Sequence, residues 1–289
     1  MRELRERGDE VTVLSRDARR AASSLGVDAQ EWRRPKDEPP PPGSLRGRDA
    51  VVHLLGETVA QRWTDDAKRE IRDSRIVATR QLVGALGRLP VEERPKVLVS
   101  QSAAGLYGPR GDERLSEEAA AGDDFLARTV REWEAEALAA ARLGLRVVVT
   151  RTGVVLSPEG GALEKMLPFF KLGIGGPVAG GRQYVPWVHL DDVVGAIVFS
   201  LDTAEVSGPL NVTAPEPVTN KELSRTLGRV LRRPAFAPVP ALAVKALYGE
   251  MATVVTTGQR AVPARLMELG YEFRQPDLES ALRSATATA

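Results

Sequence analysis

The sequence contains no cysteine and only two histidines among its 289 residues. The lack of cysteine excludes disulfide bonds, thiolate metal sites and a cysteine nucleophile, and two isolated histidines do not make a metal-binding set. The sequence also lacks an excess of charge of either sign, because 40 Lys and Arg residues nearly balance 39 Asp and Glu residues and leave a net charge of +1. We therefore expect no metal site, no general attraction to nucleic acid or to an anionic membrane, and a small molecule as the partner.

Long hydrophobic runs are missing as well. The N-terminus, MRELRERGDEVTVLSR, lacks the apolar core of a signal peptide, and no stretch reaches the roughly 18 uninterrupted apolar residues of a membrane span. In contrast, 43% of the residues are hydrophobic, which is enough for a substantial buried core. These features predict a folded protein of the cytoplasm.

Short apolar segments alternate with helix-length segments over the first half of the chain. The predicted elements are the end of a helix at 2–7, strands at 11–14, 50–55, 97–100 and 147–150, and helices at about 64–89 and 124–143. Apolar strands that are separated by helices are typical of a parallel sheet covered on both faces. We therefore predict an α/β fold with a doubly wound parallel sheet, whose ligands bind at the carboxyl ends of the strands.

Seven segments carry a family resemblance. They are VTVLSR (11–16), DAVVHLLGE (49–57), DSRIVATRQLV (73–83), SQSAAGLYG (100–108), VPWVHLDDVVGAI (185–197), NVTAPEPVTNKEL (211–223) and VPARLMELGYEFRQPDLESALR (262–283). Together they resemble the extended short-chain dehydrogenases/reductases, in an atypical "epimerase family" branch with a C-terminal domain of unknown function. The resemblance implies an NAD(P)-binding Rossmann domain at 1–158, to whose sheet 184–202 return, and a smaller α/β substrate-side region at 159–289, with the branch-specific domain at about 236–289.

One part of the family pattern is absent. The family has a first strand, a Gly-x-x-Gly-x-x-Gly loop and a helix ending in a sequence such as LRERG, and only that helix end is present here, at residues 4–8. The loop's backbone N–H groups hold the cofactor pyrophosphate, so we expect an incomplete Rossmann domain without its first strand. A start codon assigned too far downstream and a real truncation both explain this, and we favour the first because a lost central strand would expose core.

The resemblance also indicates a cofactor. The residue after the second Rossmann strand reads the adenosine ribose, and Ser15-Arg16 occupies that place. An arginine accommodates the 2′-phosphate of NADP, so we expect NADP(H) in preference to NAD, the alternative being a solvated arginine that opens the next helix. The expected cofactor-binding residues are Ser15, Arg16, Leu55, Gly56, Glu57, Ser100, Arg151 and Thr152.

The expected catalytic set is incomplete. Ser102, with Ser100 as the alternative, resembles the family's catalytic serine, whose hydroxyl hydrogen-bonds the substrate. The usual Tyr-x-x-x-Lys partner is missing, because none of the four tyrosines is followed by lysine four positions later. Tyr107, close to the serine segment, is therefore the predicted catalytic partner. Further acid or base candidates, each with an ordinary surface or packing role as the alternative, are Glu57, Arg62, Trp63 and Glu134.

These observations predict an NADP(H)-binding protein of the short-chain dehydrogenase kind that acts as an oxidoreductase or epimerase on an unidentified small molecule. A noncatalytic or regulatory NADP(H)-binding protein is the alternative, because the tyrosine-lysine pair and the glycine loop are absent. A third hypothesis is an incomplete domain that binds no dinucleotide. The sequence leaves the substrate and the oligomeric state open.

Overall fold

A four-stranded parallel sheet forms the centre of the structure, a computed structural model that describes residues 1–287. Its strands are, in spatial order, β10 (Gly208–Val212), β6 (Arg146–Thr152), β4 (Val97–Ala103) and β3 (Ala50–His53). Each neighbouring pair is parallel. The predicted parallel α/β fold is therefore confirmed, and all four strands end at the same edge of the sheet.

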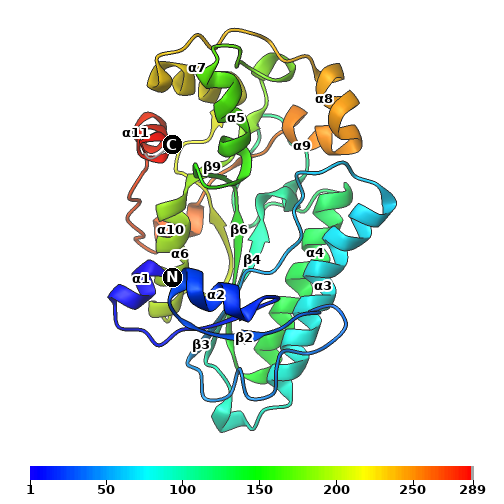
Figure 1. Cartoon of the computed structure of the whole chain (residues 1–289), viewed down its shortest axis with the longest axis vertical. Helices are drawn as coiled ribbons and strands as arrows, with labels where there is room; N and C mark the ends of the chain where they lie inside the picture. Colours follow the sequence, from blue (N-terminus) through cyan, green and yellow to red (C-terminus); the bar gives the residue numbers. More distant parts are fainter. Residues whose placement is uncertain (288–289) are drawn as a thin grey trace.

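Helices cover both faces of this sheet (Figure 1). Val147 and Val149 of β6 belong to the core under two of them, whereas Val148 between them belongs to the core on the opposite face. Because both faces are buried, the strand has a continuous apolar run in place of alternation. The covering helices are α3 (Asp65–Gly87) and α4 (Phe125–Leu138) on one face, and α6 (Leu190–Asp202) and α10 (Ala264–Glu268) on the other.

The first two strands of the chain form a separate parallel pair. β1 (Thr12–Ser15) and β2 (Asp28–Glu31) are joined through α2 (Ala18–Leu25), and the segment 32–49 that follows contains no helix or strand. β1 pairs only with β2 and β3 only with β4, so none of the described residues forms a strand between β1 and β3. Leu14 and Leu55, both partly buried, nevertheless pack against one core cluster, so β1 and the segment after β3 share a core.

A second region lies beyond the carboxyl ends of the strands (Figure 1). Its core gathers Phe170, Leu227 and Leu282 around the buried ring of Trp187. Its elements are β7 (Val154–Leu156), α5 (Gly161–Lys171), β8 (Tyr184–Val185), β9 (Trp187–His189), β11 (Val218–Thr219), α7 (Asn220–Leu231), α8 (Ala241–Tyr248), α9 (Ala252–Thr256), β12 (Arg260–Ala261) and α11 (Leu278–Thr286).

The segment 184–202 connects this region to the central sheet. Its strand β9 pairs with β7 and not with the main sheet, whereas α6, which follows directly, packs on the sheet. The strand that joins β6 at the sheet edge is β10. At the N-terminus, α1 (Arg2–Glu6) is attached to the same face, because Arg7 pairs with Asp202 at the end of α6 at 2.7 Å. None of the described helices has the length and apolar character to cross a membrane.

Candidate functional site

Three polar residues stand side by side where the strands end. The register aligns Ser102 of β4 with Arg151 of β6, and Arg151 with Asn211 of β10. All three are at least nine-tenths buried. Since buried polar groups need hydrogen-bond partners, this row must be satisfied from neighbouring elements.

Glu134 on α4 supplies the first set of partners. Its carboxylate receives two parallel hydrogen bonds from Arg151, Nε to Oε1 and Nη2 to Oε2, both at 2.9 Å. The Ser102 hydroxyl donates to Oε1 at 2.5 Å. The two charged side chains are only 9% and 8% exposed. Burial lowers the pKa of Arg151, but the hydrogen bonds and charge of Glu134 outweigh it, so the net pKa is raised and the guanidinium stays charged.

Tyr107 and Asn211 continue this network toward the segment after β5 (Arg114–Leu115). The Tyr107 hydroxyl donates to Asn211 Oδ1 at 2.6 Å and accepts from Arg151 Nη1 at 3.1 Å. Glu117 accepts from the Asn211 backbone N–H at 2.9 Å, and its own carbonyl accepts from Arg151 at 2.8 Å. The strand ends are thus held by one buried network of side chains from several elements.

The network determines what Ser102 and Tyr107 can do. Ser102 is 1% exposed and Tyr107 is fully buried, and each hydroxyl already donates to a protein oxygen. Burial raises the pKa of the Tyr107 hydroxyl, and Arg151 offsets this only in part. A phenol with a raised pKa exchanges its proton poorly near neutral pH. Both hydroxyls, which the sequence suggested as catalytic, are thus engaged with protein oxygens in this structure, and their catalytic role stays a prediction.

A second buried group joins β3 to the two helices on its face. The Thr79 hydroxyl of α3 lies 2.9 Å from Nε2 of His53 and accepts from the indole N–H of Trp133 at 3.0 Å. The imidazole is 3% exposed, and its burial lowers its pKa from 6.5 to about 4. His53 is therefore neutral in the folded protein around neutral pH.

This shift predicts a loss of stability in mild acid. The unfolded chain takes up a proton at His53 near pH 6.5 and the folded chain only near pH 4, so stability falls as the pH drops between these values. The shift of the His53 pKa corresponds to about 3 kcal/mol. Urea unfolding at pH 7 and at pH 4.5 should show this loss, and a His53→Gln variant should lose less stability over the same range. Equal losses in the two proteins would contradict a neutral buried His53.

The predicted cofactor residues after β1 lie at the surface. Ser15 Oγ accepts from the backbone N–H of Asp17 at 3.2 Å, and Asp17 in turn caps α2. Arg16 between them is exposed. Within residues 1–287 its guanidinium makes no hydrogen bond or ion pair with another residue. A guanidinium placed this way is available to an anionic group.

The predicted residues after β3 form an exposed turn. Leu55 packs into the core, Gly56 is exposed, and the Glu57 backbone N–H donates to Ser74 Oγ at 2.9 Å. The guanidinium of Arg75, a residue that the sequence did not single out, lies against Gly56. The turn therefore exposes backbone beside a cation.

The remaining predicted cofactor residues are buried in β4 and β6. Ser100 is fully buried, and Thr152 is 6% exposed with its hydroxyl donating to the Thr150 carbonyl at 3.2 Å. Arg151 is committed to Glu134, as described above. Ser100 thus lies in the middle of β4, whereas Arg151 and Thr152 lie at the end of β6, and their role in cofactor binding stays a prediction.

The loop after Glu57 connects the two regions of the molecule. Arg62 donates to the Ala246 carbonyl at 3.1 Å, and Lys165 of α5 donates to the Ala60 carbonyl at 3.0 Å. The ring of Trp63 meets that of Phe125 edge-on, with 5.1 Å between centroids. Arg62 and Trp63, candidates for acid-base chemistry in the sequence, therefore attach this loop to α8 and α4.

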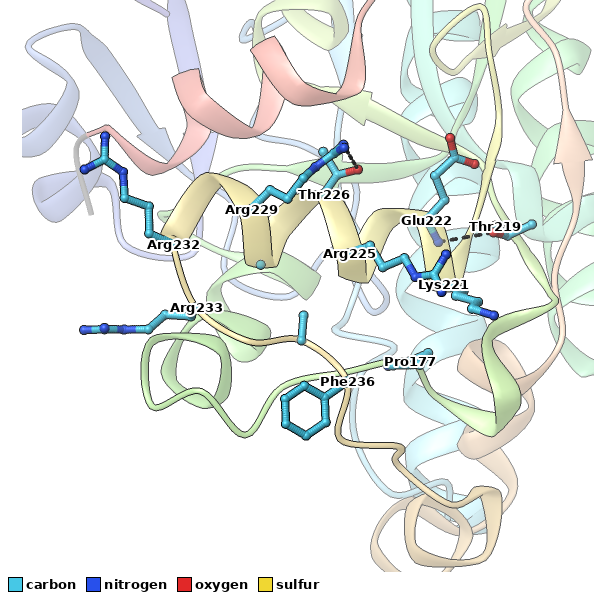
Figure 2. Close-up of a pocket in the computed structure, with 12 residues that line it drawn as sticks. Pro177, Thr219, Lys221, Glu222, Arg225, Thr226, Arg229, Arg232, Arg233 and Phe236 are labelled. Atoms are coloured by element: carbon cyan, nitrogen blue, oxygen red, sulfur yellow. Dashed lines mark hydrogen bonds between the residues drawn. The ribbon is translucent and has the colours of Figure 1, made fainter.

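A cavity of about 960 Å³ lies elsewhere, along α7 (Figure 2). Basic side chains of the helix and of the turn after it border it, together with the ring of Phe236. None of the predicted site residues lines it. In the part of the chain that the structure describes, no three acidic or histidine side chains are grouped as metal ligands would be.

Asn211, Glu117 and Arg75 are the functional candidates that sequence reasoning missed. Asn211 opens the segment NVTAPEP, which was noticed for its resemblance without a role for the asparagine. Arg75 lies in DSRIVATRQLV, which was likewise noticed without a role for this arginine, and Glu117 lies in a charged stretch that looks like ordinary surface. Only the strand register and the packing of α3 bring these residues to the strand ends.

Comparison with known proteins identifies relatives along the whole chain. Residues 1–213 match the NAD dependent epimerase/dehydratase family, and residues 239–285 match a domain of unknown function (DUF1731). The Arabidopsis thaliana chloroplastic homolog of epimerase family protein SDR39U1 is 44% identical over 83% of this chain and 69% of its own length. Epimerase family protein YfhF of Bacillus subtilis is 36% identical over 98% of this chain and 92% of its own length.

A solved structure is similar over the same range. The crystal structure of human epimerase family protein SDR39U1 with NADPH superposes with a TM-score of 0.87 at 34% identity, covering 100% of this chain and 94% of the human chain. The dinucleotide in that crystal is a finding about the human protein. It gives a specific ligand against which the strand ends described above can be tested.

Proposed function

The chain belongs to the NAD-dependent epimerase/dehydratase family, and on that premise we propose that it binds NADP(H) at the carboxyl ends of its parallel strands. The observation that carries the proposal is Arg16, an exposed guanidinium directly after β1 with no partner among the described residues. A guanidinium forms paired, charge-assisted hydrogen bonds with phosphate oxygens, so it suits the 2′-phosphate that distinguishes NADP from NAD. The NADPH in the human relative supports the same choice.

The other residues at this edge fit a dinucleotide by their chemistry. Gly56 exposes backbone in the turn after β3, where a ribose or a phosphate can approach without meeting a side chain at that position. Ser15 and Glu57 offer oxygens of the kind that accept from ribose hydroxyls. Ser100, Arg151 and Thr152 fix the floor of the site from below. We propose this division of roles for the eight predicted cofactor residues.

A protein that binds NADP(H) can be an enzyme or a noncatalytic binding protein. When bound, NADP(H) would donate or accept a hydride, so an oxidoreductase or epimerase acting on a small molecule is the first candidate. The second candidate is a noncatalytic NADP(H)-binding protein, and the enclosure of both the Ser102 and Tyr107 hydroxyls favours it. Net oxidation of NADPH by a panel of carbonyl compounds, or NADP⁺-dependent conversion of a sugar nucleotide into its epimer, would support the first, and tight binding without either reaction would support the second.

The cofactor proposal is tested by titrating the protein into NADPH and NADH while following nicotinamide fluorescence. We expect saturable binding of NADPH with a Kd at least about tenfold lower than that of NADH, because a charge-assisted hydrogen bond to the 2′-phosphate contributes about 1.5–3 kcal/mol. NADH differs from NADPH only by this phosphate and is therefore the matched control ligand. No saturable binding of either dinucleotide would contradict the proposal.

A further inference from the structure

Arg75 on α3 lies flat against the exposed turn after β3. A Cβ atom built on Gly56 would be 3.0 Å from both Cζ and Nη2 of its guanidinium. A side chain at position 56 would therefore push the guanidinium of Arg75 away from its present position. On another side, the ring of Trp133 lies 5.3 Å from the Arg75 guanidinium carbon. The cation is held in place by a backbone turn and an indole.

Most of the hydrogen-bonding capacity of Arg75 is unused. Nη1 donates to the Ile71 carbonyl one turn earlier in the same helix at 3.0 Å. Arginine carries five N–H donors, so one bond leaves most of them without a partner within the described residues. Glu57 is near enough to raise the pKa of Arg75, but its carboxylate accepts from the Thr58 backbone N–H and makes no ion pair with the guanidinium.

The other arginines of α3 behave differently. Arg69, Arg72 and Arg80 each form at least one ion pair with a nearby carboxylate at the surface. Arg75 is more buried than these three, and burial lowers its pKa. A desolvated cation without a carboxylate is costly to fold. The one arginine of the helix that faces the strand ends is thus the one that lacks an anion.

We propose that Arg75 binds an anionic oxygen group, a phosphate or a carboxylate, between the Gly56 turn and Trp133. The planar fork of the guanidinium suits two oxygens of one such group. Because Arg75 lies at the edge where we propose the dinucleotide, the inference rests on the proposed function for its setting. The anion is then either a phosphate of the cofactor or an acidic group of the substrate beside it.

The test compares Arg75→Gln and Arg75→Lys with the unmodified protein and with Arg80→Gln, which breaks a surface ion pair on the same helix. NADPH affinity is measured by fluorescence, and binding of inorganic phosphate by calorimetry. Far-UV circular dichroism and thermal melting check that each variant is folded. Arg75→Lys keeps the charge but not the fork, so it serves as the variant to read if Arg75→Gln does not fold.

A phosphate of the cofactor as the anion predicts that Arg75→Gln weakens NADPH and NADH binding alike by about tenfold or more, while Arg80→Gln leaves both unchanged. An acidic group of the substrate predicts unchanged NADPH affinity together with at least a tenfold loss of phosphate binding. Either result supports an anion site at Arg75. Unchanged affinity for both NADPH and phosphate would overturn it. If the unmodified protein binds no dinucleotide, the proposed function fails, and the phosphate titration alone then decides the role of Arg75.

Discussion

Replacing Arg151 with methionine is expected to lower the free energy of unfolding by about 3–5 kcal/mol. The substitution leaves the Glu134 carboxylate buried without its two hydrogen bonds from the guanidinium. It also removes the donors to the Tyr107 hydroxyl and the Glu117 carbonyl. Methionine keeps most of the volume, so the loss reports the unpaired charge and not a cavity. Urea unfolding at pH 7 measures it.

The matched control is the surface pair between Arg80 of α3 and Glu136, which lies on α4 as Glu134 does. Arg80→Met should cost no more than about 1 kcal/mol, because water screens an exposed pair. A double variant, Arg151→Met with Glu134→Gln, should recover part of the loss, since it removes the stranded charge. If Arg151→Met costs as little as Arg80→Met, the buried network does not hold the strand ends.

Replacing Arg16 with alanine is expected to raise the Kd for NADPH by about 10- to 100-fold and to leave the Kd for NADH within about twofold. Only NADPH carries the 2′-phosphate that the guanidinium is proposed to bind. The side chain is exposed and makes no contact with another charged residue in the described chain, so its removal should not change stability. Fluorescence titration of both dinucleotides measures the change in preference.

Arg142→Ala provides the control for a general loss of positive charge. Arg142 is also exposed, but it lies in the turn before β6, at the amino ends of the strands. Its removal should leave both dissociation constants unchanged. Equal weakening of NADPH and NADH by Arg16→Ala would show that Arg16 does not read the 2′-phosphate. No weakening of either would remove Arg16 from the site.

The central strands were predictable because their apolar residues indicate that they are buried. β3, β4 and β6 are runs of valine and leucine between helices, and such runs indicate a sheet that is covered on both faces. β2 was not predicted, since its sequence DAQE has no apolar residue except alanine and pairs on one side with β1. β10 begins with Gly-Pro, which is typical of a turn, although it joins the central sheet.

Only those site residues that lie at the ends of predicted strands could be predicted from the sequence. Ser102 and Arg151 were selected because they end strands, and they do lie side by side. Their contact with Glu134 depends on how α4 packs, and the motif resemblance alone assigned the serine to catalysis. Arg75 lies midway along α3, 19 residues after Gly56, so no local pattern connects the two. Tertiary packing, not sequence spacing, decides which polar groups are buried partners and which are available.

We therefore propose two roles for the polar residues at the strand ends, one for the buried groups and one for the available cations. Buried charges and hydroxyls at the ends of β4, β6 and β10 satisfy one another and fix the scaffold. The exposed guanidinium of Arg16 and the half-buried one of Arg75 stay without anionic partners in the described residues, and they flank the ends of β1 and β3. A ligand with two separated phosphate positions matches these two cations.

A crystal structure of the protein grown with NADPH tests this proposal most directly. We expect the dinucleotide across the carboxyl ends of β1, β3 and β4, with the 2′-phosphate within hydrogen-bonding distance of Arg16. Density for NADPH only in the cavity along α7, or at a position where neither Arg16 nor Arg75 contacts it, would contradict the proposed site.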